Sequence, residues 1–272
     1  MPHPFFDTRR PLVFAHRGGS ALAPENTIAA FENGLALGAD GLELDVRVSR
    51  DGVVVVHHDS RLERTTNLRG DVAAFSASEL ERADAGHHFG PERGWPFRGC
   101  GIGIPTLRSV LDRYPGRRVI IEMKVNHPEC AREVVDVVRG SDAVDRTCLG
   151  AFGWRVLRAV RALDPAIATS AAREEVRWAL YRSRCRWPVS RVSYDGYQVP
   201  EFAGRTTVVS PRFVAEAHRA GLGVQVWTVD DEEVARRMLE WGVDGLITDR
   251  PDLIVPLRNR AQNLGSGRGF LE

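Results

Sequence analysis

Short apolar runs alternate with helical patterns along almost the whole chain. The apolar runs are mostly continuous, and continuous apolar strands that alternate with helices are typical of a parallel sheet covered on both faces. The pattern therefore predicts an α/β fold. The predicted strands are Leu12–Ala15, Gly41–Val46, Val53–His57, Val119–Met123, Thr147–Ala151, Ala166–Thr169, a weak one near Val192–Tyr194, Gly223–Thr228 and Asp244–Thr248.

Helical patterns fill the intervals between these runs. The first, Asn26–Leu37, ends at Gly38, and Gly221 and Gly242 stand as C-terminal caps of two later helices. So many strand–helix units favour a closed TIM-type (β/α)8 barrel over an open sheet. The other predicted helices are Leu107–Arg113, Pro128–Val138, Trp154–Leu163, Glu174–Ser183, Pro211–Ala220 and Asp231–Trp241.

Two segments depart from a regular barrel. The connection Arg47–Gly52 is too short for a helical crossover, and the Asp-Gly pair at its centre predicts a hairpin-like turn between the second and third strands. The stretch Ser60–Gly103 is too long for a structureless loop, so we interpret it as an insertion after the third strand, over one barrel face. Within it, Ser76 and Glu79 are spaced for a capping box at the start of a weak helix, Ser76–Asp84.

The 272 residues contain no internal repeat and no sign of a second domain, so residues 1–272 are predicted to form a single barrel domain. Residues 257–272 are predicted to be a disordered tail. The opening MPHPFFDTRR lacks the apolar core of a signal peptide, and no apolar run is long enough to cross a bilayer. These features predict a cytoplasmic protein.

Composition narrows the classes of partner. Hydrophobic residues make up 43% and charged residues 27%, an ordinary globular balance. The formal net charge of +1 provides no bulk field for nucleic acid or an anionic membrane, so no nucleic-acid partner is expected. The scattered cysteines form no CxxC motif, which favours free thiols; they are Cys100, Cys130, Cys148 and Cys185.

Carboxylates occur within two of the predicted strands. Glu43 and Asp45 lie two residues apart and therefore share one face, and Glu122 repeats the pattern in the fourth strand. One alternative is that these carboxylates face solvent on an amphipathic strand. In an apolar parallel sheet, however, inward carboxylates repel one another unless a cation compensates their negative charge. Oxygen ligands favour Mg²⁺ or Ca²⁺ over zinc. We therefore expect these three residues to bind one divalent cation.

Histidines and basic side chains occur at the same strand ends. His16 and Arg17 follow the first strand and precede two glycines, where the backbone must bend or approach a ligand. Lys124 shares a face with Glu122 and is placed to meet an anionic oxygen. Active sites of such barrels form at the carboxyl ends of the strands. A divalent cation, two basic side chains and histidines together are typical of phosphoryl transfer.

The third strand ends in His57-His58-Asp59. The period of two sends the two histidines to opposite faces, so only one of them can face the site. Periodicity alone does not decide which.

Seven runs of sequence carry a resemblance to a known family. In chain order they are AHRGGSALAPENTIAAF at 15–31, GADGLELDVRVSRDGVVVVHHD at 38–59, LERTT at 62–66, IPTLRSVL at 104–111, IIEMK at 120–124, VQVWTVD at 224–230 and GVDGLITDRP at 242–251. As a set they are highly specific. Through them the chain resembles the glycerophosphodiester phosphodiesterase family over residues 12–256.

The resemblance implies hydrolysis of glycerophosphodiesters to glycerol 3-phosphate and an alcohol, with one divalent cation, Mg²⁺ or Ca²⁺. It also implies a barrel with an insertion after the third strand. The residues that match the family's functional positions are His16 and His58 as the acid–base pair, Glu43, Asp45 and Glu122 as metal ligands, Arg17 and Lys124 as phosphate contacts, and Trp227 in the alcohol pocket. A packing role for the Trp227 ring is the alternative.

The chain departs from the family pattern at positions that bear on substrate preference, and none of them is a proposed metal ligand or catalytic histidine. The chain has GAF at 150–152 where many members have Ser-Phe, RSVL after PTL, and WTVD for the commoner WTVN.

Two alternative functions are a lysophospholipase-D-like activity on lysophospholipids and a catalytically silent binding barrel. The intact set of functional residues opposes the silent barrel. We expect Trp227 and the insertion Ser60–Gly103 to form the wall of the active site on the side of the substrate's alcohol group. The aromatic segment 87–97 would meet an acyl chain or pack on the barrel rim, and we favour packing.

Overall fold

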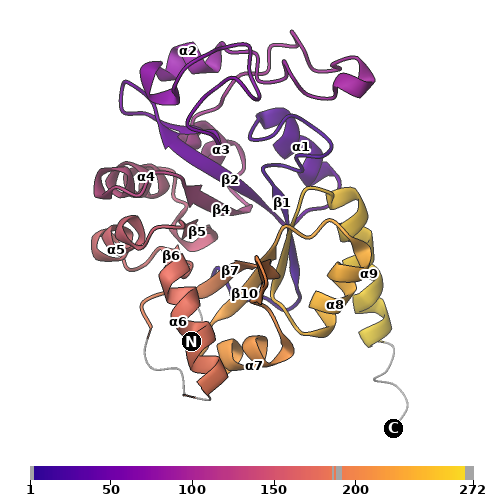
Figure 1. Ribbon diagram of the computed structural model, residues 1–272. Helices are drawn as coiled ribbons and strands as arrows, with labels where there is room; N and C mark the ends of the chain where they lie inside the picture. Colours follow the sequence, from indigo (N-terminus) through magenta and orange to yellow (C-terminus); the bar gives the residue numbers. More distant parts are fainter. Residues whose placement is uncertain (1–2, 186, 188–191, 267–272) are drawn as a thin grey trace.

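A computed structural model describes residues 3–185, 187 and 192–266, and within them a parallel barrel forms the centre of the molecule (Figure 1). The sheet order is β6-β5-β4-β2-β1-β11-β10-β7, with β3 paired to β2 outside this path. Beyond β6, Ser170 bridges to Gly196 in β7, and the amide of Ala171 donates to the Gly196 carbonyl at 2.9 Å. These contacts bring the two ends of the sheet together, as the predicted barrel requires. The parallel strands are β1 (Leu12–His16), β2 (Gly41–Val48), β4 (Arg118–Met123), β5 (Thr147–Gly150), β6 (Ala168–Thr169), β7 (Gly196–Pro200), β10 (Gly223–Trp227) and β11 (Gly245–Thr248).

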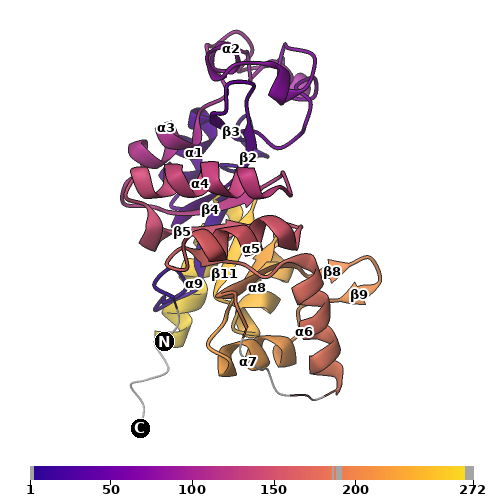
Figure 2. The same ribbon diagram turned by 90° about the vertical axis from the view of Figure 1, so that its left-hand side faces the viewer.

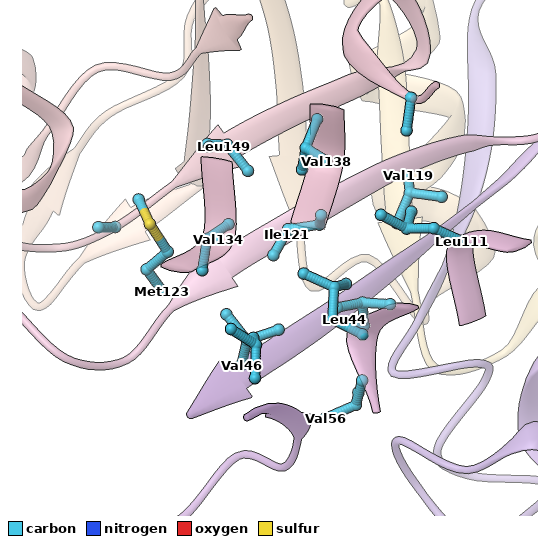
Figure 3. Close-up of a cluster of buried hydrophobic side chains, with 14 of the residues drawn as sticks. Leu44, Val46, Val56, Leu111, Val119, Ile121, Met123, Val134, Val138 and Leu149 are labelled. Atoms are coloured by element: carbon cyan, nitrogen blue, oxygen red, sulfur yellow. The ribbon is translucent and has the colours of Figure 1, made fainter. Parts of the chain in front are cut away.

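Helices surround the barrel (Figures 1 and 2). Apolar side chains on the outward faces of the strands pack against them, as Val119, Ile121 and Met123 of β4 do with Val134 and Val138 (Figure 3). Seven of them confirm predicted helices to within a few residues: α1 (Ile28–Ala36), α3 (Leu107–Arg113), α4 (Pro128–Gly140), α5 (Trp154–Leu163), α6 (Arg173–Cys185), α7 (Pro211–Arg219) and α8 (Glu232–Glu240). Helix α9 (Pro251–Ser266) was not predicted.

Inside the barrel, an apolar cluster lies beneath the strand ends. Phe14, Ile120 and Ile247 point inward from their strands, and Phe5 and Phe6 close the cluster from the N-terminal segment. The rings of Phe5 and Phe14 stack with centroids 6.0 Å apart. The interior below the strand ends is therefore dry, and a charge placed just above it is poorly solvated.

Glycines make room for this N-terminal plug. A Cβ on Gly196 would lie 2.5 Å from the Phe6 ring, and one on Gly223 would lie 2.4 Å from it. Side chains at these two strand positions would expel the Phe6 ring.

The predicted hairpin and capping box are both confirmed. Strand β3 (Val54–Val56) runs antiparallel to β2, with Val46 opposite Val56. In the segment after β3, Ser76 and Glu79 form a reciprocal capping box at the start of α2 (Ala77–Glu81), which is shorter than the predicted helix. This segment also contains the short 3₁₀ helices η1 (Val72–Ala74) and η2 (Pro91–Arg93).

The insertion packs on β3 through a core of its own. Leu62, Val72 and Leu80 are fully or almost fully buried and form a cluster with Val55 of β3. In both ribbon views the segment lies at the end of the molecule away from α6 and α7 (Figures 1 and 2).

The seventh strand in chain order was predicted too early. The structure places it at Gly196–Pro200 rather than near Val192–Tyr194. Gly196 and Gln198 face the barrel interior, so the strand lacks the continuous apolar run on which the prediction relied. A short hairpin that was not predicted follows, β8 (Phe202–Ala203) with β9 (Thr206–Thr207).

The predicted disorder from residue 257 is wrong for the part of the tail that the structure describes. Helix α9 continues to Ser266, and Leu257 is buried. Arg258 is also buried. Its charge is compensated there, because its guanidinium donates to the Pro11 carbonyl at 3.0 Å and pairs with Asp40 at 2.6 Å. Residues 267–272 of the predicted tail lie outside the described residues.

Two further properties concern the whole described chain. All four cysteines are free, and Cys130 and Cys148 are buried. Among the helices described, none combines the length and the apolar character that crossing a bilayer requires.

Candidate active site

The register of the barrel strands places the predicted site residues in one layer. His16 at the end of β1 lies opposite Glu43 of β2, and Asp45 of β2 lies opposite Glu122 of β4. A cavity of about 140 Å³ opens above this layer. Its lining contains every residue predicted for catalysis, metal or substrate: His16, Arg17, Glu43, Asp45, His58, Glu122, Lys124 and Trp227.

Two basic side chains compensate the negative charge of the buried Asp45 carboxylate. The Lys124 Nζ lies 2.9 Å from Asp45 Oδ1 and 3.0 Å from Glu122 Oε1, and the Arg17 Nε lies 3.2 Å from Asp45 Oδ2. Burial alone would raise the pKa of Asp45, but the charges of Lys124 and Arg17 outweigh it and lower that pKa below its ordinary value. Asp45 is therefore ionised although only 1% of it is exposed.

Glu43 is less well compensated. Its carboxylate accepts a hydrogen bond from the Arg17 backbone N–H at 3.1 Å and lies 3.7 Å from His16 Nε2. Burial raises the pKa of Glu43 to about 8; the charge of His16 opposes this rise, whereas Asp45 and Glu122 add to it. The charged form of Glu43 is therefore disfavoured, whereas that of Asp45 is favoured.

His16 is fixed from the side opposite Glu43. Its Nδ1 lies 2.6 Å from Asp249 Oδ1, which also accepts the Ser20 hydroxyl at 2.5 Å. Burial would lower the pKa of His16, but Glu43 and Asp249 together raise it to about 9. Sequence reasoning gave Asp249 no role, although it follows β11 directly and meets the same strand-end criterion as the other residues.

His58, and not His57, belongs to the cavity lining. The His58 Nδ1 lies 2.6 Å from Asp59 Oδ1, and the second oxygen of Asp59 accepts from Arg64 Nε at 2.5 Å. His57 is buried elsewhere, with its Nε2 3.3 Å from the Arg61 carbonyl. Burial lowers the pKa of His57, which favours its neutral form.

The loop after β1 supports the layer from the side. Asn26 is buried, and its amide donates to Asp45 Oδ2 at 2.8 Å while its carbonyl accepts from the Asp45 backbone N–H at 3.2 Å. Asn26 adopts a left-handed conformation with φ of 58°, and so does Arg17, with φ of 51°. At Gly18, with φ of 90°, a Cβ would lie 2.6 Å from the Ala30 side chain. The backbone here is therefore shaped around the carboxylates.

Arg64 ties the insertion to this loop. Its guanidinium donates to both oxygens of Glu25, at 2.7 and 2.8 Å, and Glu25 also accepts from Arg17 Nη1 at 3.0 Å. Sequence reasoning assigned no role to Glu25, Asn26 or Arg64, although they stand in the PENT and LERTT motifs that carry the family resemblance.

A larger cavity of about 590 Å³ adjoins the first. The two share Glu122, Phe152, Gln198 and Trp227 in their linings. The Phe152 and Trp227 rings meet edge-on, with centroids 6.0 Å apart, at the boundary between them. Helix α6 and the β8–β9 hairpin supply much of the wall of the larger cavity, whose apolar lining includes Val176, Leu180 and Phe202.

The expectation that the insertion Ser60–Gly103 would wall the alcohol side is wrong. No residue of this segment, all of which the structure describes, lines either cavity. The insertion packs instead on β3, and it reaches the site only through Arg64. In its aromatic segment the Phe89 and Phe97 rings pack edge-on, with centroids 5.4 Å apart, as expected for packing.

Comparison with known proteins decides the family. The model of the glycerophosphoryl diester phosphodiesterase family matches residues 16–253. The chain belongs to this family. It is accordingly a phosphoric diester hydrolase, and its barrel is the TIM-type barrel of the family's solved structures.

Three relatives of this phosphodiesterase show the range of similarity. A glycerophosphodiester phosphodiesterase of Caldanaerobacter subterraneus is 31% identical over 255 residues, 91% of this chain and 98% of the relative. Human lysophospholipase D GDPD3 is 26% identical over 97% of this chain and 90% of its own length. A phosphodiesterase of Oleispira antarctica, solved in complex with the product sn-glycerol-3-phosphate, has a TM-score of 0.74 and 27% identity over 92% of this chain and 97% of that one.

The carboxylates of this phosphodiesterase suit a hard cation in their chemistry. Among the described residues, no group of three or more acidic, histidine or cysteine side chains is already clustered as a metal site, and the Lys124 ammonium contacts both Asp45 and Glu122. All three carboxylates nevertheless line one cavity, and burial together with Asp45 and Glu122 disfavours the charged form of Glu43 there. A divalent cation with oxygen ligands would favour that charged form.

Substitutions at Asn26 test how the phosphodiesterase fixes Asp45. Asn26→Gly and Asn26→Ala both remove the hydrogen bonds to Asp45, and we expect each to lower the free energy of unfolding by roughly 1–3 kcal/mol. Asn26→Ala should cost about 1 kcal/mol more, because alanine tolerates a positive φ less well than glycine. Urea denaturation followed by circular dichroism measures both. Equal losses in the two variants would show that the left-handed backbone imposes no constraint.

Proposed function

We propose that this phosphodiesterase hydrolyses glycerophosphodiesters to glycerol 3-phosphate and an alcohol in the smaller cavity. The observation that carries the proposal is the presence of two histidines, His16 and His58, in one cavity with three carboxylates and two basic side chains. The product sn-glycerol-3-phosphate in the Oleispira antarctica relative supports the same product here.

His16 and His58 act as the acid–base pair in this proposal. One histidine takes a proton from the attacking hydroxyl, either water or the neighbouring glycerol 2-OH, as its oxygen bonds to phosphorus. The other gives a proton to the alcohol oxygen as the phosphorus–oxygen bond to that alcohol breaks. Such proton transfer contributes typically ~10²–10⁴-fold, so positioning and electrostatics supply the rest.

Each histidine has a carboxylate on its Nδ1, which leaves Nε2 for the substrate. Asp249 lies 2.6 Å from His16 Nδ1, and Asp59 lies 2.6 Å from His58 Nδ1. A carboxylate in this position fixes the ring orientation and stabilises the imidazolium. Asp249 and Asp59 are positioning residues in this scheme, since they act through the histidines.

Arg17 and Lys124 bind the phosphoryl oxygens. Both side chains line the cavity and are held by carboxylates, Arg17 by Glu25 and Asp45, and Lys124 by Asp45 and Glu122. Donors fixed before substrate arrives stabilise developing charge without reorganising. Burial would lower the pKa of Lys124, but Asp45 and Glu122 raise it above its ordinary value, so the ammonium stays charged.

Glu43, Asp45 and Glu122 hold one divalent cation, Mg²⁺ or Ca²⁺, in this proposal. The donor set is all oxygen, which suits these cations. The bound cation would supply Lewis-acid stabilisation of the phosphoryl oxygens. Trp227 lies on the boundary toward the larger cavity, where its ring forms a wall for the alcohol.

The histidine pair is tested with His57 as the matched control. We expect His16→Ala and His58→Ala each to lower kcat by about 10²–10⁴-fold, because each loses one proton transfer. His57→Ala should change kcat little, since His57 lies outside the cavity lining. Steady-state assays on glycerophosphocholine measure these values. An inactive His57→Ala with an active His58→Ala would reverse the assignment, and two active cavity variants would end the acid–base scheme.

Metal dependence is tested by chelation and by Glu43→Gln. We expect EDTA to abolish activity and Mg²⁺ or Ca²⁺ to restore it. Glu43→Gln should weaken cation binding at least about tenfold in calorimetric titration, because a neutral amide replaces a carboxylate ligand. Glu92→Gln, in the exposed 3₁₀ helix η2, is the control and should bind as the wild type does. Full activity in EDTA would refute the metal site.

A lysophospholipase-D-like activity is the second candidate, and the larger cavity favours it. A volume of about 590 Å³ beside the phosphodiester site exceeds the need of a small alcohol. Its apolar wall, including Val176 and Leu180, suits the acyl chain of a lysophospholipid.

A larger side chain in the larger cavity distinguishes hydrolysis of lysophospholipids from hydrolysis of glycerophosphodiesters. Leu180→Trp should lower kcat/KM for lysophosphatidylcholine on the order of tenfold or more, because the larger ring occupies the proposed acyl space. Hydrolysis of glycerophosphocholine should persist, and Leu180→Met, which nearly conserves volume, should retain both activities. A wild type without lysophospholipid turnover, or equal losses on both substrates, would reject this candidate.

A further inference from the structure

Exposed aromatic rings gather on the outer face of α6. Trp178 and Tyr181 are 53% and 50% exposed, and their rings stack with centroids 5.6 Å apart. Trp187, just after the helix and 54% exposed, meets Tyr181 edge-on at 6.0 Å. Three adjoining large rings that are half exposed to water mark an interaction surface rather than ordinary surface variation. We call these three residues the α6 aromatic patch.

Positive charge flanks the α6 aromatic patch. Arg173, Arg177 and Arg184 are exposed on the same helix, and in the described part of the chain none of them has an acidic partner within 4.0 Å. Arg177 and Tyr181 are four residues apart and so share a helix face. The acidic residues of α6 are Glu174, which is exposed, and Glu175, which pairs with Arg161 at 2.7 Å. The exposed face is therefore net positive.

The patch borders the larger cavity. From α6, Arg173 and Arg177 line this cavity, and Phe202 of the β8–β9 hairpin, 52% exposed, lines it as well. The hairpin projects from the molecule on the α6 side (Figure 2). Because exposed residues of both elements line the cavity, it opens on the surface that carries the patch.

We infer that the α6 aromatic patch and its arginines dock this phosphodiesterase on an anionic lipid surface. Tryptophan and tyrosine rings favour the headgroup level of a bilayer, where one end of the ring is apolar and the other wet. Arginines beside them attract anionic headgroups over about a Debye length. The net charge of +1 supplies no such attraction for the molecule as a whole, so the local patch carries it. Docked in this way, the larger cavity opens toward the lipid.

A second copy of the chain fits this surface less well. In a symmetric dimer the same patch meets itself, which would bring Arg177 and Arg184 close to their own symmetry mates. Like charges around the aromatic centre oppose such pairing, whereas an anionic lipid surface complements them.

Vesicle co-sedimentation of the full chain tests this inference. We expect binding to vesicles of phosphatidylcholine mixed with phosphatidylglycerol, weaker binding to pure phosphatidylcholine, and loss of the difference at high salt. Trp178→Ala with Tyr181→Ala should lower the partition coefficient about tenfold, and Arg184→Glu should lower it for anionic vesicles only. Trp95→Ala is the matched control, since Trp95 is 41% exposed beneath Arg98 in the distant insertion. It should bind as the wild type does.

Hydrolysis of glycerophosphocholine in solution separates this inference from the proposed function. None of Trp178, Tyr181, Arg184 and Trp95 lines either cavity, so all variants should retain this activity if the wild type has it. No binding to anionic vesicles, or unchanged binding after loss of both rings, would overturn the inference. A dimer that Trp178→Ala with Tyr181→Ala converts to monomer, without vesicle binding, would overturn it as well and make the patch a protein interface.

Discussion

The burial of two like charges above an apolar barrel interior constrains every group around them. Glu43 and Asp45 point inward from one strand, above a floor that includes the Phe5, Phe14 and Ile120 side chains. Neither carboxylate can be charged there without positive partners or hydrogen bonds. His16, Arg17, Asn26 and Lys124 supply them, and in the proposed function His16, Arg17 and Lys124 also act on the phosphodiester.

The loops are shaped by this constraint. Asn26 and Arg17 adopt left-handed backbone conformations that bring an amide, a backbone N–H and a guanidinium to the carboxylates. The insertion contributes a single arginine, Arg64, which joins Glu25 to Asp59 and so connects the loop after β1 to His58. On the opposite side of the site, α6 and the β8–β9 hairpin line the larger cavity, where our proposal places the alcohol.

Much of this was predictable because two rules act locally. Alternation along β2 and β4 placed Glu43, Asp45 and Glu122 on the inner face, and the strand-end rule identified His16 and Arg17. The choice of His58 over His57 needed the family motif, because alternation only separates the two. The partners Asn26 and Arg64 were not predicted, since hydrogen bonds between distant segments leave no periodic signal. Asp249 was missed although it stands directly after strand β11. Strand β7 was misplaced because its inward Gly196 and Gln198 interrupt the apolar run. The expectation that the insertion lines the alcohol side was wrong because its packing on β3 depends on tertiary contacts.

In the proposed function, this charged layer hydrolyses a glycerophosphodiester and leaves the phosphate on glycerol. Phosphorus-31 NMR of glycerophosphocholine incubated with the enzyme and Mg²⁺ or Ca²⁺ tests it directly, because the two possible monoester products have distinct resonances. We expect sn-glycerol 3-phosphate, with choline released in equal amount. Phosphocholine as the product, or no turnover with either cation, would contradict it.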